Sequence, residues 1–503
     1  MKSAAVGSAS LAVLSKNSSA FAAERRKPNL LFIWTDEQRA DTMAVYGNTK
    51  IHAPNLNKLA SESFVFEKAY VSQPVCTPSR ASVLTGLWPH TSGCTANNIP
   101  LPKDIPCLPE LVNDPEYRTA YMGKWHLGDE IFAQHGFEQW ESMEDGYTNY
   151  YSKGRDRSAR SSYHHFLVAT GYKPDSGDKF SRGFCARLPL EHCKPRFLER
   201  KACEFLRRSR SQPFILTINF LEPHMPFFGP LDKEHDPAEV DLPINFYDPL
   251  EENEPLRYRL HREQSRAKYG KTEQEIRELI ARYWGLVTQV DLSVGAILNT
   301  LDELGLADNT IVVYTSDHGD MMGAHHMVEK TVMYEEAVRV PWLMRVPHLG
   351  RRQRMIKSAV SHIDMMPTVL DLMGAKCGES LQGQSLAPLM QDGKVADDHV
   401  FIEWNPAHGG FGKFKRGTEM ASKKEIERLG REHIRTVVSP DGWKLCLSDL
   451  DKCQLFNLNK DPGEAINLFD SGRHRDVIER LAREIHRWQQ ETKDDVRLPI
   501  QQF

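Results

Sequence analysis

Residues 76 to 86, Cys-Thr-Pro-Ser-Arg-Ala-Ser-Val-Leu-Thr-Gly, combine a reactive side chain with the start and the end of a short helix. Thr77 is a good N-cap residue, and Pro78 suits the first position of a helix, where no N–H is needed. We therefore predict a helix over residues 79–84 that Gly86 ends. Cys76 would then lie just before a helix N-terminus, where free N–H groups and the helix dipole favour an anion.

Four short apolar runs elsewhere in the chain have the length and composition of buried strands in a parallel sheet. These runs are residues 29–35, 119–122, 213–220 and 310–316. Each is followed by polar or charged residues, and a helical pattern over residues 275–304 separates the last two. The alternation predicts an α/β fold, with a large, mostly parallel sheet sandwiched by helices. Because ligands bind beyond the carboxyl ends of such strands, the polar residues there predict one common site.

The last hundred residues have a different pattern. Residues 433–438 and a hairpin of residues 443–447 and 454–458 predict a smaller antiparallel sheet. Residues 476–490 carry an apolar stripe typical of an amphipathic helix. We therefore expect a C-terminal subdomain of an antiparallel sheet plus a helix.

Composition excludes several classes of protein. The chain has 503 residues, of which 40% are hydrophobic and 26% are charged, as is ordinary for a soluble globular protein. A net charge of −4 is small for this length and gives no general attraction to nucleic acid. Beyond the N-terminus we find no run of about 18 apolar residues, so we expect no membrane span.

The N-terminus has the pattern of an export signal. Lys2 supplies a positive charge, residues 4–14 are mildly apolar, and Ala20-Phe21-Ala22 offers a cleavage site. The alternative is a disordered tail rich in serine and alanine. We predict a signal peptide over residues 1–23, a catalytic domain over 24–400 and the C-terminal subdomain over 401–503. The mature protein would be periplasmic or secreted.

Nine cysteines leave the redox state open. Apart from Cys76 there are eight, and an even number in an exported protein permits disulfides. Cys446 and Cys453 flank the turn of the predicted hairpin, so they are the best candidates for a disulfide. Zinc binding is a weaker alternative, because no C-x-x-C pair occurs.

Two motifs carry a resemblance to a known family. Residues 76–86 match the sulfatase signature C-x-P-S-R-x-x-x-L-T-G at every specified position. Residues 123–128, Gly-Lys-Trp-His-Leu-Gly, resemble the second sulfatase signature in full. The resemblance covers roughly residues 28–375 and implies an alkaline phosphatase-like fold. It also implies that a formylglycine-generating enzyme oxidises Cys76 to formylglycine, whose hydrated aldehyde attacks a sulfate ester.

The acidic residues after two of the predicted strands suggest a cation site. Asp36 and Glu37 follow the first strand, and Asp317 and His318 follow the last. Carboxylate oxygens suit a hard divalent cation such as calcium or magnesium. The resemblance implies calcium, bound by these four residues and the modified Cys76. Glu37 departs from the family pattern, in which aspartate is commonest at this position.

The resemblance also implies the remaining catalytic residues. Arg80 and Lys124 would contact the sulfate, and His126 would take a proton from the hydrated aldehyde. His224 would bind the sulfate or protonate the leaving oxygen. Lys330 would help neutralise the ester. Such groups supply what a sulfate ester needs: a strong nucleophile, positive charge around the oxygens, and an acid.

The substrate is less determined by the sequence than the reaction. Residues 151–210 hold 15 Lys or Arg against 6 Asp or Glu, which would favour a polyanionic substrate if they border the site. A solvated basic surface is an equal alternative. We expect a sulfate ester on a carbohydrate. A phosphate or phosphonate ester hydrolase of the same superfamily, and a noncatalytic protein that binds sulfated glycans, are the alternatives.

Overall fold

The computed structural model describes residues 26–249, 253–376, 378, 380–395, 399–406 and 418–500. The predicted signal peptide, residues 1–23, lies outside these residues, as does Cys377. No helix in the described part of the chain combines the length and the apolar character needed to cross a membrane.

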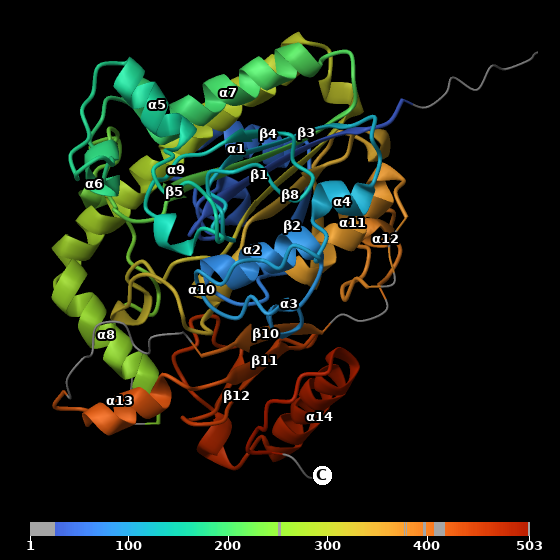
Figure 1. The fold of residues 1–503 in the computed structure, drawn as a ribbon. Coiled ribbons are helices and arrows are strands. Elements are labelled where there is room, and N and C mark those ends of the chain that lie inside the picture. Colours follow the sequence, from blue (N-terminus) through green and yellow to red (C-terminus); the bar gives the residue numbers. More distant parts are fainter. Residues whose placement is uncertain are drawn as a thin grey trace, which may run out of the picture.

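A large mixed sheet forms the centre of the molecule (Figure 1). Within the described residues it has nine strands in the order β4-β3-β5-β1-β6-β8-β2-β7, and β9 pairs with β2. The strands are β1 (Asn29–Asp36), β2 (Phe64–Tyr70), β3 (Arg118–Gly123), β4 (Gln139–Glu141), β5 (Phe214–Pro223), β6 (Thr310–Ser316), β7 (Arg339–Val340), β8 (Trp342–Arg345) and β9 (Arg354–Ser361). Strands β4, β3, β5, β1 and β6 run parallel, and β8 is antiparallel to β6. The four predicted strands are thus confirmed as β1, β3, β5 and β6, and they are neighbours.

Helices cover both faces of this sheet, as the sequence pattern predicted. The longer helices and those near the site are α1 (Pro54–Ser61), α2 (Cys76–Thr85), α3 (Pro89–Ser92), α4 (Leu108–Val112), α5 (Ser162–Ala169), α6 (Arg182–Cys185), α7 (Lys194–Ser209), α8 (Leu256–Tyr269), α9 (Glu273–Glu303), α11 (Met365–Met373) and α12 (Ala387–Met390). In β1, Leu31 and Ile33 pack into a core with α1, α7 and α9, whereas Phe32 and Trp34 pack with α2, α4 and α11. This alternation along the strand produces the sandwich.

The helix of the first signature, α2, begins earlier than predicted. It starts at Cys76, with Val75 as N-cap and without a side-chain cap, and ends before Gly86 as expected. Thr77 does not cap the helix because its hydroxyl donates to the backbone oxygen of His126 at 2.7 Å. Cys76 therefore occupies the first turn of α2, and the Thr77 hydrogen bond ties this turn to the second signature.

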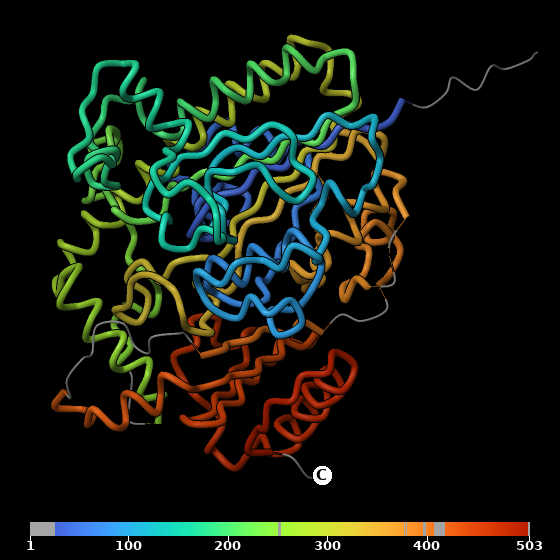
Figure 2. The backbone as a smooth tube through the Cα atoms, in the orientation of Figure 1, coloured from blue at the N-terminus to red at the C-terminus, as the bar shows by residue number. Residues whose placement is uncertain are grey.

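The C-terminal part forms a separate antiparallel sheet. Its described strands are β10 (Val400–Trp404), β11 (Ile434–Val438), β12 (Trp443–Ser448) and β13 (Gln454–Asn457), in that order. The amphipathic helix α14 (Arg475–Thr492) packs one stripe against this sheet. In Figures 1 and 2 the sheet and α14, coloured orange to red, lie at the lower end of the molecule, next to α3. The sequence predicted β11 to β13 and the helix, but missed β10.

The expected disulfide between Cys446 and Cys453 was wrong, since both cysteines are free. Cys446 pairs across the hairpin with Gln454, the residue that follows Cys453. Because adjacent residues of a strand point to opposite faces, the two thiols belong to different core clusters. Short sequence separation does not bring side chains on opposite faces of a sheet together.

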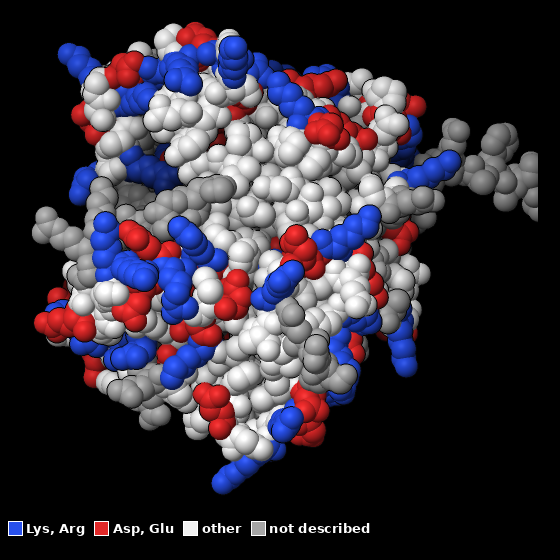
Figure 3. All heavy atoms as spheres, turned by 60° about the horizontal axis from the view of Figure 1, so that its bottom comes forward, with Lys and Arg blue, Asp and Glu red and all other residues white. Residues whose placement is uncertain are grey.

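One face of the molecule carries charged side chains of both signs. Figure 3 shows Lys and Arg next to Asp and Glu on the face that carries the C-terminal sheet. This mixing agrees with the small net charge of the chain.

Candidate active site

Four buried side chains converge at the carboxyl ends of β1 and β6. Asp36 ends β1, Asp317 and His318 follow β6, and Cys76 begins α2. One potential ligand atom from each of the four lies within 4.8 Å of the others, and no side chain of the group is more than 1% exposed. Two carboxylates, an imidazole and a sulfur atom so close together form a donor set suited to a divalent cation.

The imidazole of His318 is oriented as a metal ligand. Its Nδ1 lies 2.9 Å from the backbone oxygen of Gly319, which can only accept, so Nδ1 carries the proton. The Nε2 lone pair then points into the group, 3.3 Å from Cys76 Sγ and 3.5 Å from Asp317 Oδ1. A hydrogen bond that fixes the tautomer in this way is typical of metal-binding histidines. The residues present therefore fit a cation.

Arg80 holds the outer oxygens of both carboxylates. Its Nη2 lies 2.6 Å from Asp36 Oδ2, and its Nε lies 2.9 Å from Asp317 Oδ2. Its Nη1 donates to Lys124 O and Asn219 Oδ1, both at 2.9 Å, and the side chain is fully buried. Four of its five N–H groups are thus used within the protein. Arg80 fixes the carboxylates so that Oδ1 of each faces His318.

The positively charged ammonium group of Lys124 lies between Asp36 and Cys76. Its Nζ lies 2.5 Å from Asp36 Oδ2 and 3.8 Å from Cys76 Sγ. Burial alone would raise the pKa of Asp36, but the charges of Lys124 and Arg80 hold it well below its usual value. The preceding Gly123 has a φ of +117°, and a Cβ there would lie 1.9 Å from Asn219 O. Only glycine permits β3 to end against β5 and deliver Lys124 in this way.

His126, whose backbone oxygen accepts a hydrogen bond from the hydroxyl of Thr77 next to Cys76, lies in an unusual environment. It has a φ of +58°, and its Nε2 lies 3.0 Å from Asn98 Oδ1. Its Nδ1 is buried and has no hydrogen-bond partner among the described residues. Burial, reinforced by Lys124 and Arg80, lowers the pKa of His126 well below 6.5. The ring is therefore neutral, and Nδ1 is free to accept a proton.

Glu130 is a site residue that the sequence did not reveal. Its carboxylate accepts the backbone N–H groups of Trp125 at 2.9 Å and His126 at 2.7 Å. The residue is 1% exposed, and burial raises its pKa to about 7 despite these two hydrogen bonds. Glu130 holds the turn that carries His126. Its place two residues after the second signature was the one available hint.

Glu37, His224 and Lys330 form a second group next to the first. Glu37 Oε2 lies 2.9 Å from Lys330 Nζ and 3.5 Å from His224 Nε2. His224 Nδ1 lies 2.8 Å from the carbonyl of Met225, so Nδ1 carries the proton and Nε2 is bare. Burial, with Lys330 nearby, lowers the pKa of His224 well below 6.5. Glu37 is not one of the group formed by Asp36, Cys76, Asp317 and His318, but with Asp36 and His224 it forms a second group that could hold a cation.

The surroundings of Cys76 suppress thiolate chemistry. Burial and the charge of Asp36 raise the pKa of its thiol to about 11, although Lys124 opposes this. Because the thiolate is the nucleophilic form of cysteine, an unmodified thiol here is unreactive at neutral pH.

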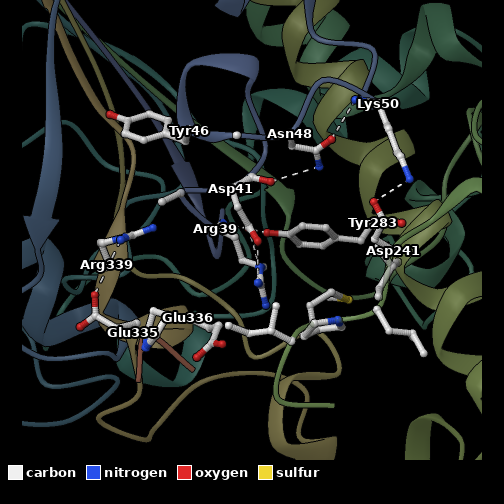
Figure 4. Close-up of a pocket in the computed structure, with 18 of the residues that line it drawn as sticks. Arg39, Asp41, Tyr46, Asn48, Lys50, Asp241, Tyr283, Glu335, Glu336 and Arg339 are labelled. Carbon is white, nitrogen blue, oxygen red and sulfur yellow. Dashed lines mark hydrogen bonds and ion pairs between the residues drawn. The ribbon is translucent and has the colours of Figure 1, made fainter. Parts of the chain in front are cut away.

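A separate cavity of about 510 Å³ lies behind the loop that follows β1 (Figure 4). Its charged side chains pair with one another: Arg39 with Asp41, Lys50 with Asp241, and Arg339 with Glu335. Tyr283 Oη donates to Glu37 O at 2.8 Å and accepts from Arg39 N at 2.9 Å. Lys68 and Glu336 also line the cavity, which thus carries four basic and four acidic residues and supports the backbone of the site.

The fold and the site define a hydrolase of the alkaline phosphatase-like superfamily. The sequence model of the family described as "Sulfatase" matches residues 28–375, so the chain belongs to the sulfatase family. Membership of this family, together with relatives that are sulfatases, identifies the chain as a sulfuric ester hydrolase.

Several known proteins resemble the whole chain. An uncharacterized sulfatase of Escherichia coli is 28% identical over 466 residues, which cover 91% of this chain and 86% of that protein. An N-acetylglucosamine-6-O-sulfatase of Bacteroides thetaiotaomicron is 26% identical over 535 residues, covering 94% and 88%. Among solved structures, a phosphonate monoester hydrolase of Agrobacterium radiobacter has a TM-score of 0.74 at 20% identity, covering 92% of this chain and 96% of that one. The structural likeness shows a common fold.

Proposed function

We propose that this chain hydrolyses a sulfate ester of a carbohydrate through a formylglycine made from Cys76. The observation that carries the proposal is the convergence of Cys76 with Asp36, Asp317, His318 and Lys124 in one buried group. A thiol with a pKa of about 11 is a poor nucleophile there, whereas an aldehyde hydrate offers a hydroxyl in the same place. Cys76 also lies in the first turn of α2, where backbone N–H groups favour an anion.

The cation we propose is calcium, with magnesium as the alternative. Asp36, Asp317, His318 and the modified Cys76 would hold it, since their donor atoms already face one another. When bound, a divalent cation supplies positive charge that stabilises an oxyanion and lowers the pKa of a hydroxyl.

The side chains then divide the work of the reaction. One hydroxyl of the hydrated aldehyde loses its proton to solvent and attacks sulfur, and the S–O bond to the alcohol breaks. Lys124 and Lys330 balance the developing charge. Arg80 keeps Asp36 and Asp317 in place. His126, with its free Nδ1, takes the proton of the second hydroxyl, so the aldehyde re-forms and inorganic sulfate leaves.

Protonation of the leaving alcohol is assigned to His224. In the protein without substrate this ring is neutral and its Nε2 is bare, so it must first gain a proton. A bound sulfate ester is an anion and raises the pKa of a neighbouring imidazole. His224 would therefore be charged by its own substrate and then donate from Nε2.

The main alternative is that the chain hydrolyses a phosphate or phosphonate ester. Two phosphonate monoester hydrolases with the same fold favour this alternative. Rates on matched sulfate and phosphate esters, 4-nitrophenyl sulfate and 4-nitrophenyl phosphate, separate the two. We expect sulfate release to be faster, and a strong preference for phosphate would overturn the proposal. Binding of sulfated sugar without turnover, by fully modified protein, would indicate the noncatalytic alternative.

We also propose that the protein is exported and that a formylglycine-generating enzyme modifies Cys76 during maturation. The N-terminal pattern of residues 1–23 supports export, and the intact signature over residues 76–86 supports modification. N-terminal sequencing of protein from its natural compartment tests the first point, with a start at Ala23 or Glu24 expected. An unprocessed Met1 in exported protein would contradict the signal peptide.

A further inference from the structure

A second cavity, of about 410 Å³, lies beside the candidate active site. It lies between the 143–147 loop and the N-terminal ends of α5, α6 and α7. Its charged or polar lining includes Glu144, Asp145, Tyr147, His164, Lys179, Arg182 and Lys194. Its volume falls within the range of about 300–1,000 Å³ that is typical of ligand pockets.

Two of the lining residues connect this cavity to the catalytic histidines. The ring of Tyr147 lies 4.7 Å from the ring of His126, measured between centroids. Arg182 Nη1 lies 3.5 Å from His224 Nδ1, and Arg182 Nη2 donates to Tyr147 Oη at 2.9 Å. A sulfate bound at His126 and His224 would therefore lie next to Tyr147 and Arg182.

Arg182 has hydrogen-bonding capacity that the protein does not use. Its Nε and Nη2 each lie 2.6 Å from an oxygen of Glu144, which fixes the plane of the guanidinium. Its Nη1 faces His224 Nδ1, but that nitrogen already donates to Met225 O and cannot accept. Within the described residues Nη1 thus has no acceptor, and the side chain remains 33% exposed.

The charges of the cavity favour an anion. Glu144 is the common partner of Arg182 and of Lys194, whose Nζ lies 3.1 Å away. Two cations on one carboxylate leave a net charge of +1, which the carboxylate of Asp145, paired with His164 in the same lining, offsets. Lys179 adds another cation, because its Nζ contacts Thr148 Oγ1 at 2.9 Å and, in the part of the chain that the structure describes, no carboxylate.

We propose that this cavity is a subsite for the sugar adjacent to the scissile sulfate, and that Arg182 binds an anionic group of that sugar, a carboxylate or a second sulfate. A guanidinium with a fixed plane and free N–H groups suits either anion. The proposal rests on the proposed function, because it takes the sulfate to lie at His126 and His224. Of the basic residues in segment 151–210, the proposal places Arg182, Lys179 and Lys194 at the subsite and assigns no such place to the others.

The test compares matched substrates. The first set contains sulfated disaccharides with a uronic acid, each paired with its carboxyl-reduced form. The second set contains monosulfated sugars, each paired with a disulfated form. 4-Nitrophenyl sulfate, which has no second anionic group for Arg182 to bind, reports the basic reaction. For fully modified wild type and for Arg182→Gln, Arg182→Lys and Lys179→Gln, we measure kcat/KM on each substrate and the unfolding temperature.

We expect wild type to prefer the anionic member of at least one pair. Arg182→Gln should lower kcat/KM for that member by about 10- to 100-fold, the effect of one charge-assisted hydrogen bond, and lower it far less for the neutral member. Arg182→Lys should recover part of the loss. Lys179→Gln should reduce the same preference even if Arg182→Gln proves unstable. Arg208→Gln is the matched control, since Arg208 is 65% exposed on α7 and pairs with Glu204.

Three other outcomes would overturn either the subsite or the proposed function. Equal rates on both members of every pair in wild type, or equal losses on both members in the variants, would overturn the subsite. Hydrolysis of 4-nitrophenyl sulfate without turnover of any sugar would also overturn it while leaving sulfate ester hydrolysis intact. Failure to hydrolyse any sulfate ester would instead reject the proposed function itself.

Discussion

The ammonium group of Lys330 lies 2.9 Å from Oε2 of Glu37, and this ion pair is almost entirely buried. Burial raises the pKa of Glu37 well above its usual value, although Lys330 opposes the shift. The pair lies next to His224 rather than among Asp36, Asp317 and His318. The structure thus pairs Glu37 with Lys330 and also places it with Asp36 and His224 in a second group of possible metal ligands, so its role as a metal ligand stays a prediction.

This arrangement makes a prediction about metal content. Asp317→Asn should lower the calcium bound per chain at least about tenfold, because a carboxylate of the donor set is lost. Glu37→Gln should retain the metal but raise KM for the sulfate ester, since Lys330 loses its partner. Elemental analysis by mass spectrometry after dialysis measures the metal. Loss of calcium in Glu37→Gln would place Glu37 among the ligands.

Metal removal in the wild type provides a second measurement at the same group. Chelation should suppress hydrolysis of 4-nitrophenyl sulfate, and added calcium should restore it, because Asp36 and Asp317 then regain their cation. Undiminished activity of metal-free protein would exclude a catalytic cation. Recovery with magnesium but not with calcium would correct the identity of the ion.

Cys76 offers a test of the nucleophile. Cys76→Ala should lower kcat by more than about 1,000-fold, as expected when a covalent nucleophile is removed, without loss of the folded state. Cys76→Ser retains one hydroxyl but lacks the second hydroxyl from which His126 takes a proton. The serine variant should therefore accumulate a sulfated peptide covering residues 76–86, detected by mass spectrometry. Substantial turnover by Cys76→Ala, or an intact thiol throughout active wild type, would reject the assignment.

The backbone conformation and close packing at Gly123 leave no room for a side chain. A Cβ at this position would lie 1.9 Å from Asn219 O, and the φ of +117° is itself unfavourable for alanine. Gly123→Ala should destabilise the protein by about 3 kcal/mol or more and displace Lys124. Thermal unfolding and kcat measure the two effects. Gly305→Ala is a control with a positive φ but no atom within 4 Å of the added Cβ, and it should be milder.

Glu130 gives a pH-dependent prediction. Its pKa is about 7 in the folded protein, against an ordinary value of 4.5. Between these values the folded protein binds more protons here than the unfolded chain, so the free energy of unfolding falls as pH rises. In Glu130→Gln this contribution is absent. The stability of the variant relative to wild type should increase by up to about 3 kcal/mol from pH 5 to pH 8.

Denaturant unfolding at both pH values measures this difference, with Glu110→Gln as a control at a partly exposed glutamate. A difference between Glu130→Gln and wild type that does not change with pH would mean that Glu130 keeps an ordinary pKa in the folded protein.

Much of the fold could be predicted because its pattern is local. The apolar runs that became β1, β3, β5 and β6 are buried on both faces, and such strands show as continuous hydrophobic stretches. The helix α9 showed as a 3.6-residue period over residues 275–304, and in the structure it begins at Glu273, after the N-cap Thr272 of a Thr272–Glu275 capping box. The start of α2 was displaced because the Thr77 hydroxyl bonds to His126, a contact between distant segments.

The site residues divide in the same way. The sequence identified Asp36, Cys76, Lys124, Asp317 and His318 by motif, and the fold brings them together. It gave no sign that Arg182 reaches His224, since the two belong to different elements. Glu130 was also missed, because a carboxylate that accepts backbone N–H groups leaves no distinctive pattern.

The sequence by itself determined the α/β class and the chemical groups of the site, because hydrophobic periodicity and short motifs are properties of adjacent residues. Only the tertiary structure decided which oxygen faces which cation. Glu37 follows Asp36 directly, yet it turns to Lys330, which lies far away in the sequence. Such choices depend on packing between segments separated by up to about 280 residues, and burial makes them strict, since a buried charge must find a partner.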